Sequence, residues 1–262
     1  MIKLSGLTKR FGSFTAVNNL DLEVRAGELF GFLGPNGAGK TTTIRMLTGL
    51  LRPTSGQAIV AGFDIQKDPV EAKAHLGYVP DEPVLYEKLT GREFLRFMAD
   101  LYRVDERKRE ERIQELLQLF QLEERADELI QSYSRGMKQK ASLAGALIHD
   151  PRVLVLDEPT VGLDPRSARV LKDVLRALAA RGVTVFMSTH ILEIAERMCT
   201  RVGIIRAGQL VACGTMPELR AGAGATPAGA TGAPVSLEDI FLQLTGSIEY
   251  ADVIRLLGEE TP

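Results

Sequence analysis

Residues 34–42 carry the first candidate chemistry, because they match the Gly-x-x-x-x-Gly-Lys-Thr pattern of a phosphate-binding loop. Glycine has no Cβ, so such a loop can turn its backbone N–H groups inward around phosphate oxygens. Lys40 can neutralise the charge of a β- or γ-phosphate, and the hydroxyl of Thr41 can ligate Mg²⁺. The predicted triphosphate site consists of Gly34, Pro35, Asn36, Gly37, Ala38, Gly39, Lys40, Thr41 and Thr42.

Two adjacent carboxylates follow the apolar run at 153–156, which is typical of a central parallel strand. Asp157 and Glu158 would stand at the carboxyl end of that strand, where their charges are costly unless something cationic lies beside them. His190 follows a second apolar run, at 184–187. A lone histidine is more often a satisfied surface or core residue, so His190 gains weight only from the other motifs.

Two polar turns each predict the start of a helix. Ser134 lies in a polar loop and can cap a helix that ends near His149. Asp164 and Pro165 have the residue types of an N-cap and a first helical position. Both turns therefore place short polar side chains at helix N-termini.

The elements that must position these residues alternate strands with helices. Residues 2–7 and 20–24 predict strands, the second with the alternation of a half-buried antiparallel strand. Residues 29–33 predict a buried strand that leads into the phosphate loop, and a helix at 43–51 should stop before Pro53. Further strands are expected at 57–61, 153–156, 184–187, 202–206 and 209–212, and a helical region opens with a capping box at 90–93.

In this order the motifs resemble the ATP-binding cassette (ABC) family of ATPases, over roughly residues 2–220. Besides the phosphate loop, the likeness rests on the Ser-Arg-Gly-Met-Lys-Gln segment at 134–139, the Asp-Glu pair at 157–158, the Gly-Leu-Asp segment at 162–164 and His190. Several motifs in the expected order make a chance match remote.

The resemblance implies an α/β P-loop fold with a mostly parallel sheet, an N-terminal antiparallel β portion and a helical subdomain at about 82–150. The ATPase domain would span residues 1–220. Residues 221–234 contain only Ala, Gly, Thr and Pro, which predicts a flexible linker. A helical tail is expected at 235–262, with a first helix capped by Ser236 and a second built on Val253, Ile254, Leu256 and Leu257.

The resemblance also implies roles for the three acidic and basic residues at the strand ends. By the family pattern, Asp157 orients Mg²⁺ through its water shell. Glu158 resembles the residue that polarises the attacking water, and His190 would donate a hydrogen bond to the γ-phosphate of ATP. The cofactors implied are ATP and Mg²⁺.

The resemblance also implies that the two polar turns lie at an interface between two cassettes. Ser134 and Gly136 fit the family's signature loop, whose N–H groups and hydroxyl form a second anion site that faces the nucleotide of a partner cassette. Asp164 would lie in the loop that crosses this interface. A single chain would then hold half of each active site, in a homodimer or in a heterodimer with another cassette.

One departure from the family pattern concerns the metal site. Asp81 stands where the family usually has glutamine, which puts in doubt the usual role of this position in sensing Mg²⁺ and γ-phosphate. A carboxylate there could help Thr41 and Asp157 to hold Mg²⁺, or it could only cap a turn beside Pro80 and Pro83.

Other departures concern the signature loop and the nucleotide base. Arg135 and Met137 replace the Gly and Gln of many family members, but the small and hydroxyl-bearing positions are intact. Phe11 matches the aromatic residue that stacks on adenine, although tyrosine is common there and a core phenylalanine is about as plausible from its position alone. Stacking accepts any base, so Phe11 would discriminate bases poorly.

Composition limits the partners. The 262 residues include 32 Lys and Arg against 34 Asp and Glu, a net charge of −2, which gives no global basis for gripping nucleic acid or anionic lipid. Two cysteines without metal-ligand spacing suggest a reducing compartment. We expect no leader peptide and no spanning helix. The expected location is cytoplasmic, peripheral on the cytoplasmic face of the membrane.

The expected function is ATP hydrolysis that powers an ABC transporter. The segment at 236–241 resembles the C-terminal helix of single-cassette subunits that serve bacterial exporters with a separate membrane polypeptide. The partners implied are an integral membrane permease and a second cassette, with no nucleic acid. The main alternative is a soluble ABC ATPase in DNA maintenance, translation or cofactor assembly, but neither two cassettes nor a long coiled-coil insertion is present. A regulator without turnover is disfavoured by the intact Lys40, Asp157, Glu158 and His190.

Overall fold

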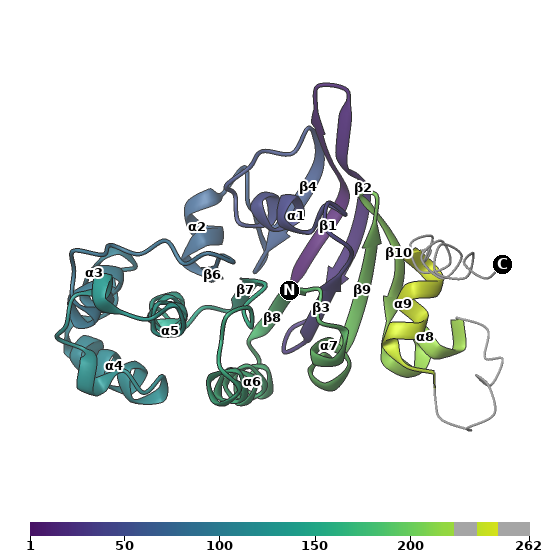
Figure 1. The fold of residues 1–262 in the computed structure, drawn as a ribbon. Coiled ribbons are helices and arrows are strands. Elements are labelled where there is room, and N and C mark those ends of the chain that lie inside the picture. The colour runs from purple at the N-terminus through teal and green to yellow at the C-terminus, as the bar shows by residue number, and fades with distance from the viewer. Residues whose placement is uncertain (223–234, 246–262) are drawn as a thin grey trace, which may run out of the picture.

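A computed structural model describes residues 1–222 and 235–245 (Figure 1). The predicted linker at 221–234 lies outside the described residues except for its first two positions, which close helix α8 (Met216–Gly222). The second tail helix, expected around 253–257, also lies outside them. In the ranges that the structure describes, no helix is long and apolar enough to cross a membrane.

A four-stranded antiparallel sheet forms the N-terminal part, in the order β2-β1-β4-β5. Its strands are β1 (Ile2–Phe11), β2 (Phe14–Val24), β4 (Ser55–Val60) and β5 (Phe63–Asp64).

The first two strands are longer than the predicted 2–7 and 20–24. Gly6 has a φ of +56°, and the pairing register shifts between Leu4 and Leu7. Such a bulge lets the strand continue past a break in the alternation of apolar and polar residues. The hairpin therefore extends to a tight turn beyond the predicted strand end.

The second sheet has six strands in the order β10-β9-β3-β8-β7-β6. Neighbouring strands run parallel except β9 and β10, which form an antiparallel hairpin. This architecture confirms the predicted α/β fold with a mostly parallel sheet. The strands are β3 (Leu29–Leu33), β6 (Leu76–Val79), β7 (Val153–Asp157), β8 (Thr184–Thr189), β9 (Arg201–Arg206) and β10 (Gln209–Gly214).

Four helices begin directly after the caps that the sequence predicts, Thr90, Ser134, Asp164 and Ser236. The first helix begins at Lys40 rather than at the predicted 43. Thr90 and Glu93 form the expected capping box. The first helix stops at Leu47 rather than at 51, because Gly49 adopts a φ of +71° and the following N–H groups bond back to the Arg45 carbonyl. Besides α8, the described helices are α1 (Lys40–Leu47), α2 (Pro69–Ala74), α3 (Gly91–Leu101), α4 (Glu106–Leu119), α5 (Arg135–Leu147), α6 (Pro165–Ala180), α7 (Leu192–Met198) and α9 (Leu237–Thr245).

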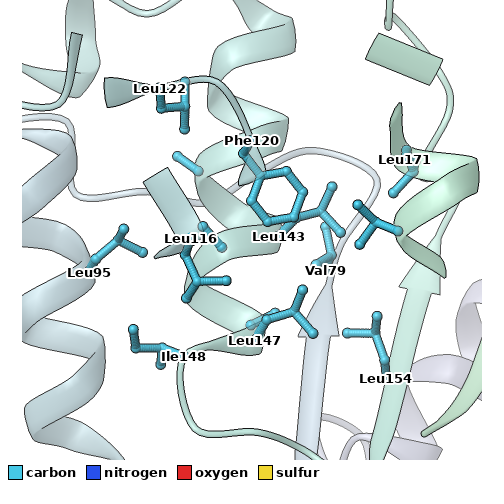
Figure 2. Packing of buried hydrophobic residues seen from close by; sticks show 14 of the residues in the cluster. Val79, Leu95, Leu116, Phe120, Leu122, Leu143, Leu147, Ile148, Leu154 and Leu171 are labelled. Atoms are coloured by element: carbon cyan, nitrogen blue, oxygen red, sulfur yellow. The ribbon is translucent and has the colours of Figure 1, made fainter. Parts of the chain in front are cut away.

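Helices α3, α4 and α5 lie together at one end of the molecule, while α8 and α9 lie at the other (Figure 1). Figure 2 shows Leu116 and Phe120 of the α4 region packed toward Leu143 and Leu147 of α5. The same buried cluster includes Leu154 of β7, so the apolar core is continuous from the helical region to the parallel sheet. Movement of α5 is thereby mechanically linked to the sheet.

Helix α9 begins where the Ser236 pattern predicts a helix. The Ser236 hydroxyl accepts the Asp239 N–H at 3.1 Å, and the Asp239 carboxylate accepts the Ser236 N–H at 3.0 Å. Leu237 and Ile240 are buried in a cluster that also contains Leu33, the last residue of β3. The tail helix thus packs on α7 and α8, in an apolar cluster that extends to the end of the strand leading into residues 34–42.

Candidate nucleotide-binding site

The loop at 34–42 connects β3 to α1 and is packed tightly against its neighbours. A Cβ on Gly34 would lie 2.5 Å from the carbonyl oxygen of Ile205, and one on Gly39 would lie 2.5 Å from that of Ala16. Gly39 also has a φ of +107°, which other residues rarely adopt. A Cβ on Gly37 would meet nothing within 4 Å. The loop is therefore packed against its neighbours at Gly34 and Gly39 and open to solvent at Gly37.

Lys40 bends over this loop. Its side chain is 8% exposed, and Nζ donates to the carbonyl oxygens of Gly34 at 2.7 Å and Pro35 at 3.2 Å. Glu158 Oε1 lies 4.0 Å from the same nitrogen. Burial lowers the pKa of Lys40, and the charges of Glu158 and Asp157 partly offset that shift. Lys40 is therefore the cation beside the buried Asp157 and the largely buried Glu158.

Asp157 ends β7 and is 3% exposed. Its Oδ1 accepts a hydrogen bond from the hydroxyl of Ser188 at 2.5 Å, and the two residues are paired directly across the parallel strands β7 and β8. Sequence reasoning assigned no role to Ser188, because the pairing register of two distant strands is not visible in either strand alone.

Glu158 has a left-handed backbone, with a φ of +48°. Its N–H donates to the Ser188 hydroxyl at 3.1 Å, and its Oε2 lies 2.9 Å from Nδ1 of His190 and accepts the His190 N–H at 3.3 Å. A non-glycine residue in this conformation is strained, and such strain is concentrated at functional sites. The backbone turn aims the carboxylate at Lys40 and His190.

A cavity of about 320 Å³ opens in front of the loop. It brings together predicted residues from three parts of the chain and adds Phe14 and Ala16, which the sequence reasoning did not name. The cavity is lined by Phe14, Ala16, Pro35, Asn36, Gly37, Gly39, Lys40, Thr41, Thr42, Asp81 and Glu158. Gly34 and Ala38 of the predicted set lie buried beneath it.

An adjoining cavity of about 360 Å³ shares Thr41 and Asp81 and includes Asp157. The three residues predicted to surround Mg²⁺ therefore meet at one place. Arg45 and Tyr78 also line this cavity. Burial, with a smaller contribution from Asp157, raises the pKa of Tyr78 to about 12, so its hydroxyl stays protonated at neutral pH.

The turn between β1 and β2 carries two phenylalanines. Phe11 and Phe14 are paired across the hairpin, with exposed fractions of 50% and 62%. Phe11 is not a core residue; its ring lies 5.1 Å from Nζ of Lys9. Phe14 lines the cavity and Phe11 does not. Phe14 stands two residues before Ala16, which also lines the cavity, so the two side chains lie on the same face of β2.

The predicted signature residues lie elsewhere in the chain. Ser134 caps α5 by accepting the Met137 N–H at 3.3 Å, and Asp164 caps α6 by accepting the Ser167 N–H at 2.9 Å. The hydrogen bonds from the Ser167 N–H and hydroxyl hold the pKa of Asp164 below its usual value. Neither Ser134, Gly136 nor Asp164 lines the cavity at the phosphate loop.

A larger cavity of about 490 Å³ lies in the helical region. Tyr102 and His149 stack at its wall with ring centroids 3.7 Å apart. Burial lowers the pKa of His149 to about 4. None of the residues with predicted chemistry lines this cavity, so size alone does not identify the functional site.

The fold and this site define a P-loop nucleotide-binding protein. A family model described as ABC transporter matches residues 17–161. These residues include the loop, the helical region and the Asp157–Glu158 pair. The chain therefore belongs to the ABC transporter family, and it is an ATP-binding cassette of that family. The predicted resemblance is confirmed.

Relatives of known name support the same assignment. The chain is 39% identical over 252 residues to the "Daunorubicin resistance ATP-binding protein DrrA3" of Streptomyces coeruleorubidus, covering 94% of this chain and 78% of that protein. It is 41% identical over 221 residues to the "Probable multidrug ABC transporter ATP-binding protein YbhF" of Escherichia coli (strain K12). That match covers 84% of this chain but only 38% of YbhF.

A solved structure shows the same fold in a dimer. It is a dimeric post-hydrolysis state of the ATP-binding cassette MJ0796 bound to ADP and Pi, with a TM-score of 0.76 and 25% identity. The match covers 82% of this chain and 99% of that one.

Proposed function

We propose that this chain binds MgATP in front of the 34–42 loop and hydrolyses it, and that hydrolysis powers an exporter in the membrane. The observation that carries the proposal is the convergence of Lys40, Asp157 and Glu158 at the carboxyl ends of β3 and β7, beside an open phosphate cradle. The relatives named for drug resistance and multidrug transport support export as the direction.

The residues present fit the proposed ligands. The cradle is open at Gly37, and Lys40 is held by carbonyl oxygens that a phosphate can replace as its partners. Thr41, Asp157 and Asp81 supply the oxygen atoms that Mg²⁺ prefers. When bound, MgATP supplies the phosphoanhydride bond and a cation that neutralises its charge.

Glu158 is the residue that we assign to the attacking water. Its carboxylate is fixed by His190 and by the strained backbone at its own position. A carboxylate held in this way can orient and polarise a water molecule for in-line attack. His190 is exposed and can turn toward the γ-phosphate, where a hydrogen bond stabilises the charge that develops.

The base of the nucleotide would lie against the β1–β2 hairpin. Phe11 was expected to stack on adenine, and the cavity lining adds Phe14 and Ala16 to that side. Both rings are exposed and free of hydrogen-bonding groups, which suits stacking with little discrimination among bases.

The dimer is the second part of the proposal. Ser134, Gly136 and Asp164 do not line this chain's own cavity, which is expected if they complete the site of a partner cassette. The dimeric cassette with ADP and Pi supports this arrangement. Closing of two cassettes around ATP would then drive a separate membrane permease, with the chain peripheral on the cytoplasmic face.

The alternative functions are less well supported. Names of the relatives place them in transport and resistance rather than in DNA maintenance, translation or cofactor assembly. A regulator without turnover would not need Glu158 and His190 in hydrogen-bond contact beside Lys40.

The test is the substitution Glu158→Gln. Turnover should fall by roughly 10² to 10⁴ while ATP stays bound, because the amide keeps the shape but cannot polarise water. ATP should then accumulate a closed dimer, measured by size-exclusion chromatography. Glu193→Gln on α7 is the matched control, since Glu193 is exposed and, in the described part of the chain, pairs only with Arg197. Normal turnover by Glu158→Gln would remove this residue from the mechanism.

A further inference from the structure

Arg135, the first residue of α5, packs against the backbone of Gly162 in the loop that precedes α6. A Cβ placed on Gly162 would lie 2.7 Å from Nε, 2.9 Å from Cδ and 3.0 Å from Cζ of Arg135. The arginine side chain therefore covers the face of Gly162 where another residue would carry its side chain. Gly162 also has a φ of +77°, a backbone conformation that favours glycine.

The contact is one of packing rather than charge. Arg135 is exposed, and within residues 1–222 and 235–245 its guanidinium makes no hydrogen bond or ion pair. Lys138, one turn further along α5, pairs with Glu87 instead. An arginine stem can cover a neighbouring surface while its head remains in water.

Among the described residues, no hydrogen bond or ion pair joins α5 to the loop at 159–164. Leu163 approaches Gly136, where a Cβ would lie 3.8 Å from its side chain. Thr160 Oγ1 in the loop and Gln139 Nε2 on α5 are buried and make no hydrogen bond among the described residues. The contact between α5 and the loop therefore depends on apolar packing, and the Arg135 side chain lies on the solvent-exposed side of this contact.

We propose that Arg135 is a positioning residue that holds the 159–164 loop against the start of α5. It thereby sets the spacing between Ser134 and Asp164, the two polar turns assigned to the partner-facing surface. This inference rests on the proposed two-cassette site, and it concerns a position where many family members have glycine. Loss of the contact should loosen the loop and slow turnover without changing how the chain binds its own ATP.

The first experiment measures the loop in the isolated full-length chain. Amide hydrogen exchange at 160–164 should accelerate roughly tenfold in Arg135→Ala and stay near wild type in Arg135→Met, which keeps the stem but not the charge. Arg169→Ala is the control, because Arg169 is an exposed arginine on α6 outside the contact. Unchanged exchange in Arg135→Ala would overturn the proposal, whatever the ATPase assay shows.

The second experiment measures ATPase rates of the same variants. In Arg135→Ala, kcat should fall roughly tenfold with KM within about twofold, because the misplaced loop acts after binding. Arg135→Met should restore most of the rate. If Arg135→Met is as slow as Arg135→Ala and only Arg135→Lys recovers, the charge acts directly and positioning is wrong. Absence of turnover in the wild type would instead contradict the proposed function, while the exchange data still decide the contact.

Discussion

The two halves of the candidate site differ in how complete they are. In the phosphate-loop half, Lys40, Asp157 and Glu158 each have partners within the chain. In the half formed by the starts of α5 and α6, Ser134 is exposed and Arg135 makes no polar contact among the described residues. One chain thus builds a phosphate cradle from its own residues, whereas in the second half Ser134 and Asp164 bond only within their own helix starts among the described residues and no cavity-lining residue joins them.

The electrostatics of the halves explain this difference. Lys40 is nearly buried, and an unpaired buried charge is costly, so folding must place carboxylates beside it. The guanidinium of Arg135 stays in water, so it pays little desolvation cost and needs no ion-pair partner within the chain. Substitutions in the buried half should therefore impair ATP binding by a single chain. Substitutions in the exposed half should impair only the activity of the assembled dimer.

The largest effect on nucleotide binding is expected for Lys40→Ala. Loss of its charge-assisted hydrogen bonds should weaken MgATP binding by about 1 to 3 kcal/mol, a factor of roughly 5 to 150 in Kd. Isothermal titration calorimetry on the single chain measures it. Lys67→Ala is the control, because the Lys67 side chain is exposed and Asp64 is its only ion-pair partner among the residues that the structure describes. Equal affinity for both variants would contradict the phosphate-loop assignment.

A mixture of variants tests whether the exposed half acts across the interface. Ser134→Arg and Lys40→Ala chains should each be nearly inactive, because in a homodimer of either variant both composite sites carry the substitution. Mixing equal amounts should recover about a quarter of wild-type ATPase activity, since half of the dimers hold one intact site. No recovery, with both variants folded and dimeric, would count against composite sites or indicate strict coupling between them.

A smaller effect is expected at the base side of the cavity. Phe14→Ala should weaken ATP binding by about 1 kcal/mol, roughly fivefold, through lost stacking. Phe11→Ala in the same hairpin is its matched comparison, and inorganic tripolyphosphate is the control ligand. An effect of Phe14→Ala on ATP but not on tripolyphosphate assigns the contact to the base. If only Phe11→Ala weakens ATP, Phe14 is part of the cavity wall alone.

The smallest effect is expected for Asp81→Asn. Asp81 is exposed, so removal of its charge should raise the Mg²⁺ concentration for half-maximal ATPase activity by no more than about fivefold. ATP binding should be preserved, and stimulation by the membrane partner should weaken because this loop adjoins the expected docking surface. Mg²⁺ titrations with and without the partner measure both. Superimposable curves would leave Asp81 as turn structure.

Local rules accounted for most of the element starts. The capping box at Thr90, the cap at Asp164 and the strand at 29–33 depend on residues within a few positions of one another, and the structure has each of them where the sequence predicted. Element ends were less predictable. The early stop of α1 at Leu47 and the bulge at Gly6 both depend on glycine backbone angles that the apolar pattern does not reveal.

By itself, the sequence determined the phosphate loop, the carboxylate pair and the family, because each is a contiguous pattern whose chemistry follows from residue type and order. Only the tertiary structure decided which residues meet. Ser188 reaches Asp157 across 31 positions, Phe14 enters the cavity, and Arg135 covers Gly162. These contacts depend on strand register and helix placement, which are set by packing of the whole core rather than by any segment alone.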